Sequence, residues 1–102
     1  MFNYPILGYI FYADTFGFVK KSLHTKQHNI LLEILYQFRL NAGLTQSQLA
    51  TCLQVPQSFV SKYENGERRL DLMELESICA CVNVDLLDFI REYQQRLHET
   101  KS

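Results

Sequence analysis

The sequence has almost no excess of charge, no hydrophobic run long enough for a membrane-spanning helix and no glycine-rich phosphate-binding loop. Ten Lys and Arg residues stand against eleven Asp and Glu residues, so the net charge of −1 indicates neither a nucleic-acid-binding protein nor a protein that binds acidic partners. A chain of 102 residues has room for one domain, which excludes a large multidomain enzyme. The apolar content of 47% is typical of a folded globular protein.

Metal-binding and catalytic patterns are also missing from the sequence. The three cysteines, Cys52, Cys79 and Cys81, include no Cys-x-x-Cys pair, and the histidines lie in other segments. We therefore expect no metal site and no cofactor, and we interpret the cysteines as reduced and buried, as is usual in the cytoplasm. No set of acids, bases or nucleophiles converges in the sequence, so we do not expect an enzyme.

Residues 1–26 form an amino-terminal arm of different composition. Residues 1–18 contain seven of the thirteen aromatic residues, and no positive charge precedes them as it would in a secretory signal. Tyr, Ile and Phe favour strands, so we predict an extended arm or a weak β-hairpin that packs on the body or on a second subunit. Contact with a membrane and a natural start of translation at Val19 are the two alternatives.

After the arm, the apolar residues follow a helical period and no strand pattern appears. Between Gln27 and Ala42 they recur three or four residues apart, which predicts one helix with a single apolar stripe. Gly43 follows as a stop signal. The predicted stripe consists of Leu31, Ile34, Leu35, Phe38 and Ala42.

Two short helices are predicted next, over residues 46–53 and 57–64. Thr45 and Gln48 form a capping box at the start of the first, with each side chain able to bond the other residue's backbone. Pro56 suits the first turn of the second helix, because its missing N–H would be unpaired there. The predicted inner faces are Leu49, Ala50 and Leu53 on the first helix and Phe59, Val60 and Tyr63 on the second, and Tyr36 is likewise assigned to the core.

The last two helices also have start signals in the sequence. Asp71 with Glu74 opens the fourth helix, Asn83 ends it, and Asp85 with Asp88 opens the fifth. The sequence therefore predicts an all-α body of five short helices. Tyr93 and Leu97 continue the fifth stripe either as cover for the bundle or as a dimer seam. The predicted inner faces are Leu72, Leu75, Ile78, Cys79 and Val82 on the fourth helix and Leu86, Ile90, Tyr93 and Leu97 on the fifth.

The spacing of the helices at 46–53 and 57–64 is typical of a helix-turn-helix, whose second helix enters the major groove of DNA. The outer face of that second helix carries only neutral or positive hydrogen-bonding side chains. Glutamine pairs bidentately with adenine, and lysine reaches guanine or phosphate. By itself, this composition would also fit a solvent-exposed surface without a binding role. The helix-turn-helix spacing is what favours contact with DNA. The predicted base-reading residues are Gln57, Ser58, Ser61 and Lys62.

The charge distribution supports this location for the site. Residues 39–69 have a net charge of +2, whereas residues 70–100 have a net charge of −5 and are expected to face away from DNA. The predicted phosphate contacts lie at the start of the first short helix and after the second, although the two arginines among them could serve only solubility. These residues are Gln46, Asn65, Arg68 and Arg69.

The stretch LNAGLTQSQLATCLQVPQSFVSKYENGERRLDLMELESICACVNVDLLDF resembles the Cro/C1-type helix-turn-helix family, also called the XRE family. The resemblance covers about residues 28–90 and rests on AGLTQ, VPQSFVSKYENG and LDLMEL. It implies a five-helix, lambda-repressor-like DNA-binding bundle, which we assign to residues 27–98. It also implies binding to double-stranded operator DNA, usually as a symmetric dimer. The bundle and arm use up the chain, so we predict no small-molecule ligand.

The resemblance assigns the same base-reading and phosphate-contacting residues, and it adds an internal pair. Arg39 and Glu64 match an ion pair that locks the first helix to the third. The turn between the two short helices departs from the family, which often has glycine where this chain has Gln54. A positive φ at Gln54 would add a small strain.

These observations together predict a non-enzymatic, sequence-specific transcription regulator of the cytoplasm that binds DNA as a homodimer. The alternative is a protein-interaction module or antitoxin-like adaptor with the same fold, and binding to random duplex at low salt separates the two.

Overall fold

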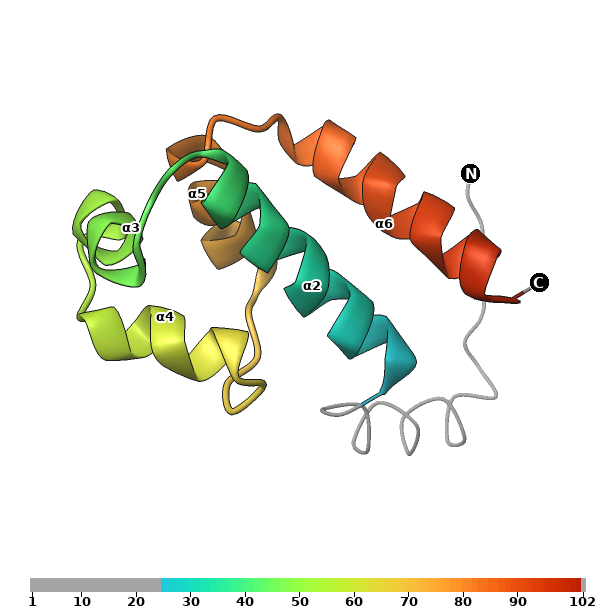
Figure 1. The fold of residues 1–102 in the computed structure, drawn as a ribbon, viewed down its shortest axis with the longest axis horizontal. Coiled ribbons are helices and arrows are strands. Elements are labelled where there is room, and N and C mark those ends of the chain that lie inside the picture. Colours follow the sequence, from blue (N-terminus) through green and yellow to red (C-terminus); the bar gives the residue numbers. More distant parts are fainter. Residues whose placement is uncertain (1–24, 102) are drawn as a thin grey trace.

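The computed structural model describes residues 25–101 (Figure 1). This part of the chain forms helices without any strand, which confirms the predicted all-α fold. The predicted arm or hairpin falls outside the described residues, except that the first helix of the described part already begins at Lys26 and its cap is Thr25. The helices are α2 (Lys26–Asn41), α3 (Gln46–Leu53), α4 (Gln57–Glu64), α5 (Leu72–Cys81) and α6 (Leu86–Lys101).

The two long helices, α2 and α6, lie side by side and run in opposite directions (Figure 1). The helices α3 and α4 pack against each other at one end of the molecule, where α3 also contacts α5 and α4 contacts α2. This arrangement leaves one side of α4 outside the bundle.

The helix starts follow the predicted capping residues. Thr45 Oγ1 accepts a hydrogen bond of 3.0 Å from the backbone N–H of Gln48, and the Gln48 side chain accepts one of 2.9 Å in return. Asp71 and Glu74 form the same reciprocal box at the start of α5. Each box satisfies backbone donors that have no partner inside a helix, which is why these residues fix where α3 and α5 begin.

The turn between α3 and α4 has the positive φ at Gln54 that was expected to add a small strain if it occurred. Gln54 has a φ of 61° and a ψ of 44°, in the left-handed region that costs a residue other than glycine about 1–2 kcal/mol. Asn83, which ends α5, has a φ of 64° and tolerates this region better because its short side chain bonds locally. The left-handed residue Gln54 reverses the chain, so that only three residues separate the end of α3 from the start of α4.

The core lies where α2, α3, α4 and α5 meet, and it contains most of the predicted inner faces. Leu49 and Ala50 of α3 and Val60 and Tyr63 of α4 are buried. They attach the two short helices to the bundle through one face each. The remaining buried apolar residues are Ile30, Leu32, Ile34, Leu35, Ile78, Cys79, Val82 and Phe89.

Three side chains that the sequence placed in the core are exposed, and those predictions were wrong. Ala42 lies just past the last residue of α2, and Leu72 is the first residue of α5, so both are beyond the reach of the core. Tyr36 lies on an outer face of α2, where its ring packs 5.3 Å from the Arg39 guanidinium.

The buried faces of the long helices also differ from the predicted stripes. Ile30 and Leu32 of α2 are buried, because α2 packs against α4 on one side and α6 on another and therefore buries a wider arc than one stripe. On α6 the most deeply buried residue is Phe89, which contacts Phe38 edge to face with ring centroids 6.2 Å apart. The sequence had assigned the neighbouring Ile90, which is only half-buried.

The expectation of three reduced, buried cysteines is corrected for two of them. Cys52 on α3 and Cys81 at the end of α5 form a disulfide, with Cα atoms 6.1 Å apart. Cys79 is buried and reduced as predicted, and burial raises the pKa of its thiol to about 11. The pair was missed because its members are 29 residues apart and meet only once α3 packs on α5.

Candidate nucleic-acid interface

The outer side of α4 presents the four predicted base-reading residues. Gln57, Ser58 and Lys62 are exposed and Ser61 is half-buried, while Val60 and Tyr63 on the opposite side of the helix fill the core. The hydrogen-bonding groups therefore share a surface that the bundle does not cover.

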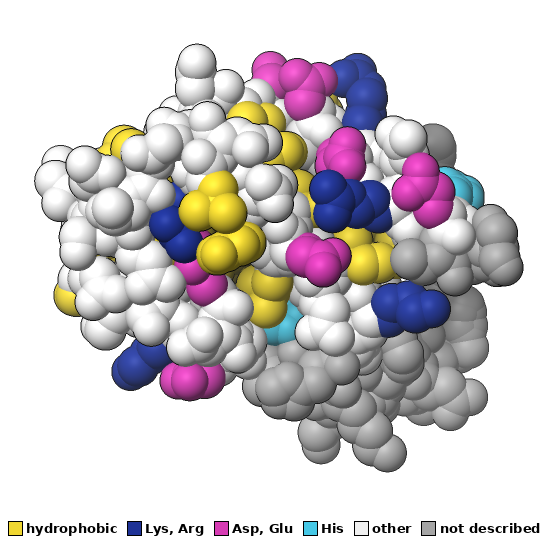
Figure 2. Space-filling model, in the orientation of Figure 1, with side chains coloured by type: hydrophobic (Ala, Val, Ile, Leu, Met, Phe, Trp, Pro, Cys, Tyr) yellow, Lys and Arg dark blue, Asp and Glu magenta, His cyan; other side chains and the backbone are white. Residues whose placement is uncertain are grey.

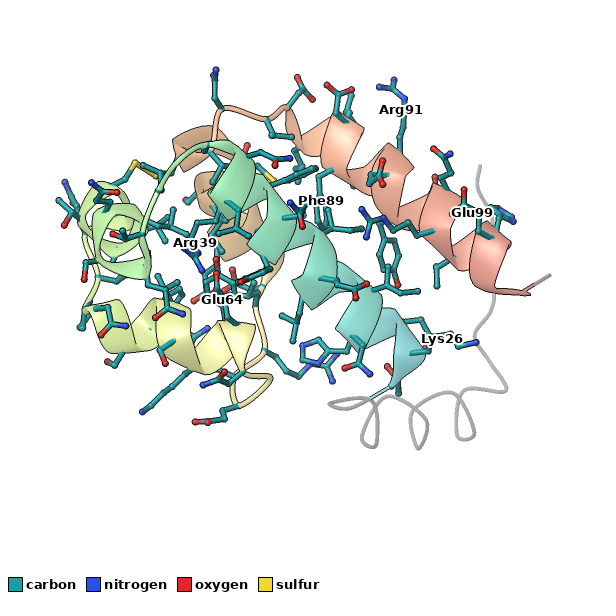
Figure 3. The ribbon with its side chains drawn as sticks, viewed as in Figure 1. Lys26, Arg39, Glu64, Phe89, Arg91 and Glu99 are labelled. Carbon is teal, nitrogen blue, oxygen red and sulfur yellow. A yellow bond between two sulfur atoms is a disulfide. The ribbon has the colours of Figure 1, made fainter. Side chains whose placement is uncertain are left out.

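A buried ion pair joins the other end of α4 to α2. Arg39 Nε lies 2.7 Å from Glu64 Oε2, Arg39 Nη2 lies 3.1 Å from Oε1, and the two side chains are 8% and 6% exposed. Arg39 Nη1 also donates to the carbonyl oxygen of Leu44, at 2.8 Å. The hydrogen bond to Glu64 raises the pKa of the Arg39 guanidinium. Figure 3 shows both side chains pointing toward each other between α2 and α4.

Two glutamines extend this ion pair to the outer face of α4. Gln46 Nε2 donates to Glu64 Oε1 at 2.8 Å, and Gln46 Oε1 accepts from Gln57 Nε2 at 2.7 Å. Because an ionised carboxylate only accepts, Gln46 must turn its amide nitrogen to Glu64 and its oxygen to Gln57. The Gln57 carboxamide is thereby oriented, and its oxygen and second N–H remain for another partner.

This network gives Gln46 a place that the sequence did not predict. Its side chain was expected to contact phosphate, yet it is half-buried and bonded at both ends of its carboxamide within the protein. The local sequence does not indicate the hydrogen bond between Gln46 and Gln57, because the two residues are eleven positions apart on different helices.

The loop after α4 contains the other predicted phosphate-contacting residues, and Arg68 is tied to α5. Its Nη2 lies 2.8 Å from Glu74 Oε2, its Nη1 donates to the carbonyl oxygen of Arg69 at 2.8 Å, and its guanidinium packs 4.4 Å from the centre of the Phe59 ring. Arg69 and Asn65 are exposed. The Arg68 contacts fix the path of the loop beside α4.

The pair of Arg68 and Glu74 predicts a pH dependence of stability. The hydrogen bond from Arg68, followed by that from the Asp71 backbone, lowers the pKa of the Glu74 carboxyl below its usual 4.5. The folded state thus binds fewer protons, so this stabilisation is present at neutral pH and is lost as pH falls from about 4.5 through the lowered pKa. Because the pair is partly exposed, the effect should stay below about 1 kcal/mol.

Urea unfolding of the protein and of Glu74→Gln between about pH 5 and pH 3 measures this contribution. The unaltered protein should lose stability more steeply than the variant as the pH falls. Parallel curves would contradict the assignment.

Charge is unevenly distributed over the face drawn in Figure 2. The part over α3 and α4 shows few charged side chains and consists mainly of backbone and uncharged side chains, whereas acidic and basic side chains alternate toward α6. Acidic residues of α6 include Asp88, Glu92 and Glu99. These acidic residues of α6 lie away from α3, whereas Asp71, Glu74 and Glu76 of the same acidic segment lie at the start of α5 or on it, and α5 packs against α3.

Residues 25–101 give no sign of a metal centre or a membrane anchor. Within this range, no three His, Cys, Asp or Glu side chains are grouped closely enough to ligate a metal ion. None of the helices in the described range has the length and apolar character needed to span a bilayer.

Comparison with known proteins gives a consistent family assignment. A helix-turn-helix family model matches residues 35–89. The structure of an XRE-family like protein from Pseudomonas syringae pv. tomato is 38% identical, with 78% of this chain and 96% of that chain covered and a TM-score of 0.69. No curated protein sequence matches the chain.

Two further solved structures show the same fold at lower identity. The clp gene regulator ClgR from Corynebacterium glutamicum is 22% identical, with 76% of this chain and 82% of that chain covered and a TM-score of 0.66. A variant of the restriction-modification controller protein C.Esp1396I is 23% identical, with 72% and 92% covered and a TM-score of 0.66. On the strength of the family match and the first of these relatives, the chain belongs to the XRE family of helix-turn-helix DNA-binding proteins.

Proposed function

We propose that the protein is a transcription regulator that recognises a specific double-stranded DNA sequence with α4 in the major groove and acts as a homodimer in the cytoplasm. The observation that carries the proposal is the orientation of Gln57 on the outer face of α4 by Gln46, Glu64 and Arg39. The network begins at a buried ion pair and ends on an exposed carboxamide. A surface that only contacts solvent does not need such an oriented side chain, whereas base reading does.

Base recognition is assigned to the outer face of α4. Gln57 has an oxygen acceptor and one N–H left, which is the pair that adenine N6 and N7 require. Ser58 and Ser61 offer hydroxyls that donate or accept, and Lys62 offers a cation for guanine or phosphate.

Phosphate contacts are assigned to both ends of the motif. The amino terminus of α3 offers backbone N–H groups at Gln46, where the positive end of the helix dipole favours an anion. Asn65 and Arg69 flank the other end of α4. Arg68 acts on the same loop mainly by positioning it, because Glu74 already holds its guanidinium.

A homodimer follows from the small number of available cations. Arg39 is buried in its ion pair, and Arg68, Arg91 and Arg96 each pair with a carboxylate in the described residues. A monomer should therefore bind DNA weakly, and salt should remove the few phosphate contacts that it makes. Two subunits that read half-sites about one helical turn apart would reach useful affinity.

Replacing Gln57 with alanine tests the base-reading role. We expect a loss of about 1–3 kcal/mol on the operator, roughly a 5- to 150-fold rise in Kd, with little change on random duplex. Fluorescence titration of both duplexes measures it, and Gln94→Ala on the exposed face of α6 is the matched control. Equal losses of affinity for operator and random DNA would contradict a base-reading role for Gln57. No binding of the unaltered protein to any duplex at low salt would favour the protein-interaction adaptor.

A further inference from the structure

The disulfide between Cys52 and Cys81 lies apart from the face assigned to DNA. Cys52 belongs to the last turn of α3, directly before the turn that leads into α4, and Cys81 is the last residue of α5. Figure 3 shows the sulfur–sulfur bond between α3 and the end of α5, with α4 on the other side of α3. The bond therefore fixes the first helix of the motif to the body at a point where no base or phosphate contact is assigned.

Both cysteines reach the solvent-accessible surface of the protein. Cys52 is an exposed residue, and the half-buried Cys81 lines an open hollow of about 450 Å³ beside the end of α2. The lining of the hollow is partly apolar, with Phe38 and Leu44, and partly polar, with Asn41 and Asn83. By contrast, Cys79 is 1% exposed, so the third thiol of the chain is not accessible to small thiols or disulfides.

We propose that Cys52 and Cys81 form a reversible redox site that exchanges with low-molecular-weight thiols and disulfides, and that its oxidation state controls operator affinity. The regulatory part rests on the proposed function, because a DNA-binding protein works in a compartment that keeps thiols reduced. Disulfides in such a compartment are usually transient and serve catalysis or redox sensing.

A small disulfide is the oxidant that converts the two protein thiols into the protein disulfide. The Cys81 thiolate, formed by loss of its proton, attacks one sulfur of the small disulfide in the hollow and releases one small thiolate. The Cys52 thiolate then attacks the Cys81 sulfur of the mixed disulfide, which forms the protein disulfide and releases the second small thiolate. The two protein thiols together lose two protons and two electrons, and the small disulfide becomes two thiols. Reduction runs through the same steps in reverse.

The bond affects DNA binding through the position of α3. In the oxidised protein, the disulfide links α3 covalently to α5. The hydrogen bonds of Gln46, at the other end of α3, keep Gln57 oriented. In the reduced protein, α3 keeps its packing through Leu49 and Ala50 and the hydrogen bonds of Gln46, but it loses the covalent link to α5. The binding-competent arrangement then becomes a smaller fraction of the population, and Kd rises in inverse proportion to that fraction. We expect the reduced protein to bind its operator several-fold more weakly.

Counting thiols tests the redox site without DNA. The full chain is equilibrated with graded ratios of reduced to oxidised glutathione, and exchange is then stopped with acid. The free thiols are alkylated under denaturing conditions and counted from the intact mass of the protein. The alkyl count should change from one to three across the series, and from zero to two in Cys79→Ala. One alkyl group at every ratio would show that the disulfide is not reduced and would contradict a reversible site. Three alkyl groups at every ratio would show that Cys52 and Cys81 do not form a disulfide.

Operator titration of the oxidised and reduced chain tests the regulatory part. Reductant should raise the Kd of the unaltered protein several-fold and leave Cys52→Ser unchanged, with the variant matching the reduced protein. Equal Kd values for the two redox forms would overturn the control of affinity. If neither form binds any duplex, the proposed function fails and the control of affinity fails with it, whereas the thiol count still decides whether the redox site exists.

Discussion

Replacing Glu64 with alanine is expected to lower the free energy of unfolding by about 3–5 kcal/mol. The change leaves the Arg39 guanidinium buried with one carbonyl partner and removes the acceptor of Gln46. An uncompensated buried charge costs far more than the net value of the pair, because desolvation is no longer offset by the carboxylate. Chemical denaturation monitored by circular dichroism measures the loss.

The exposed pair of Asp88 and Arg91 provides the matched control for Glu64→Ala. Its side chains are 66% and 72% exposed, so Asp88→Ala should change the free energy of unfolding by less than about 1 kcal/mol. Replacing both Arg39 and Glu64 with apolar residues of similar volume should cost less than Glu64→Ala alone. Equal effects of Glu64→Ala and Asp88→Ala would show that the buried pair does not stabilise the attachment of α4.

Loss of the disulfide is expected to produce the second largest effect on stability. The bond closes a loop across 29 residues, and removing such a link should lower the free energy of unfolding by about 2–4 kcal/mol, because the unfolded chain regains freedom. Cys52→Ser is a mild replacement, since residue 52 is exposed. Denaturant unfolding of oxidised and reduced protein measures the change.

The variant also supplies the control for the effect of reductant. Reductant should destabilise the unaltered protein to the level of Cys52→Ser and should leave the variant unchanged. If the oxidised protein and Cys52→Ser unfold at the same denaturant concentration, the bond contributes nothing to the packing of α3 on α5.

Local chemistry explains why the sequence predicted the helix starts. A capping box needs only two residues three apart, as at Thr45 and Gln48, and the structure forms those bonds. The expectation for Gln54 was conditional, namely that a positive φ would add a small strain, and the structure has a φ of 61° there.

The errors arose where two helices had to be placed relative to each other. Tyr36 was assigned to the core although it lies outside the predicted stripe, and which arc of α2 is covered depends on α4 and α6. The disulfide and the bond between Gln46 and Gln57 join residues on different helices, so no spacing along the chain reveals them. The candidate site was predicted as a set of side chains, whereas its internal support required the structure.

Selection of bound duplexes from a random pool is the most direct test that α4 reads base sequence. The enriched duplexes should contain two inverted half-sites whose centres are about one helical turn apart, near 10 base pairs. The same selection with Gln57→Ala should lose the preference at one position in each half-site. A pool that stays random while the protein still retains duplex would contradict the account, because binding would then rest on phosphates alone.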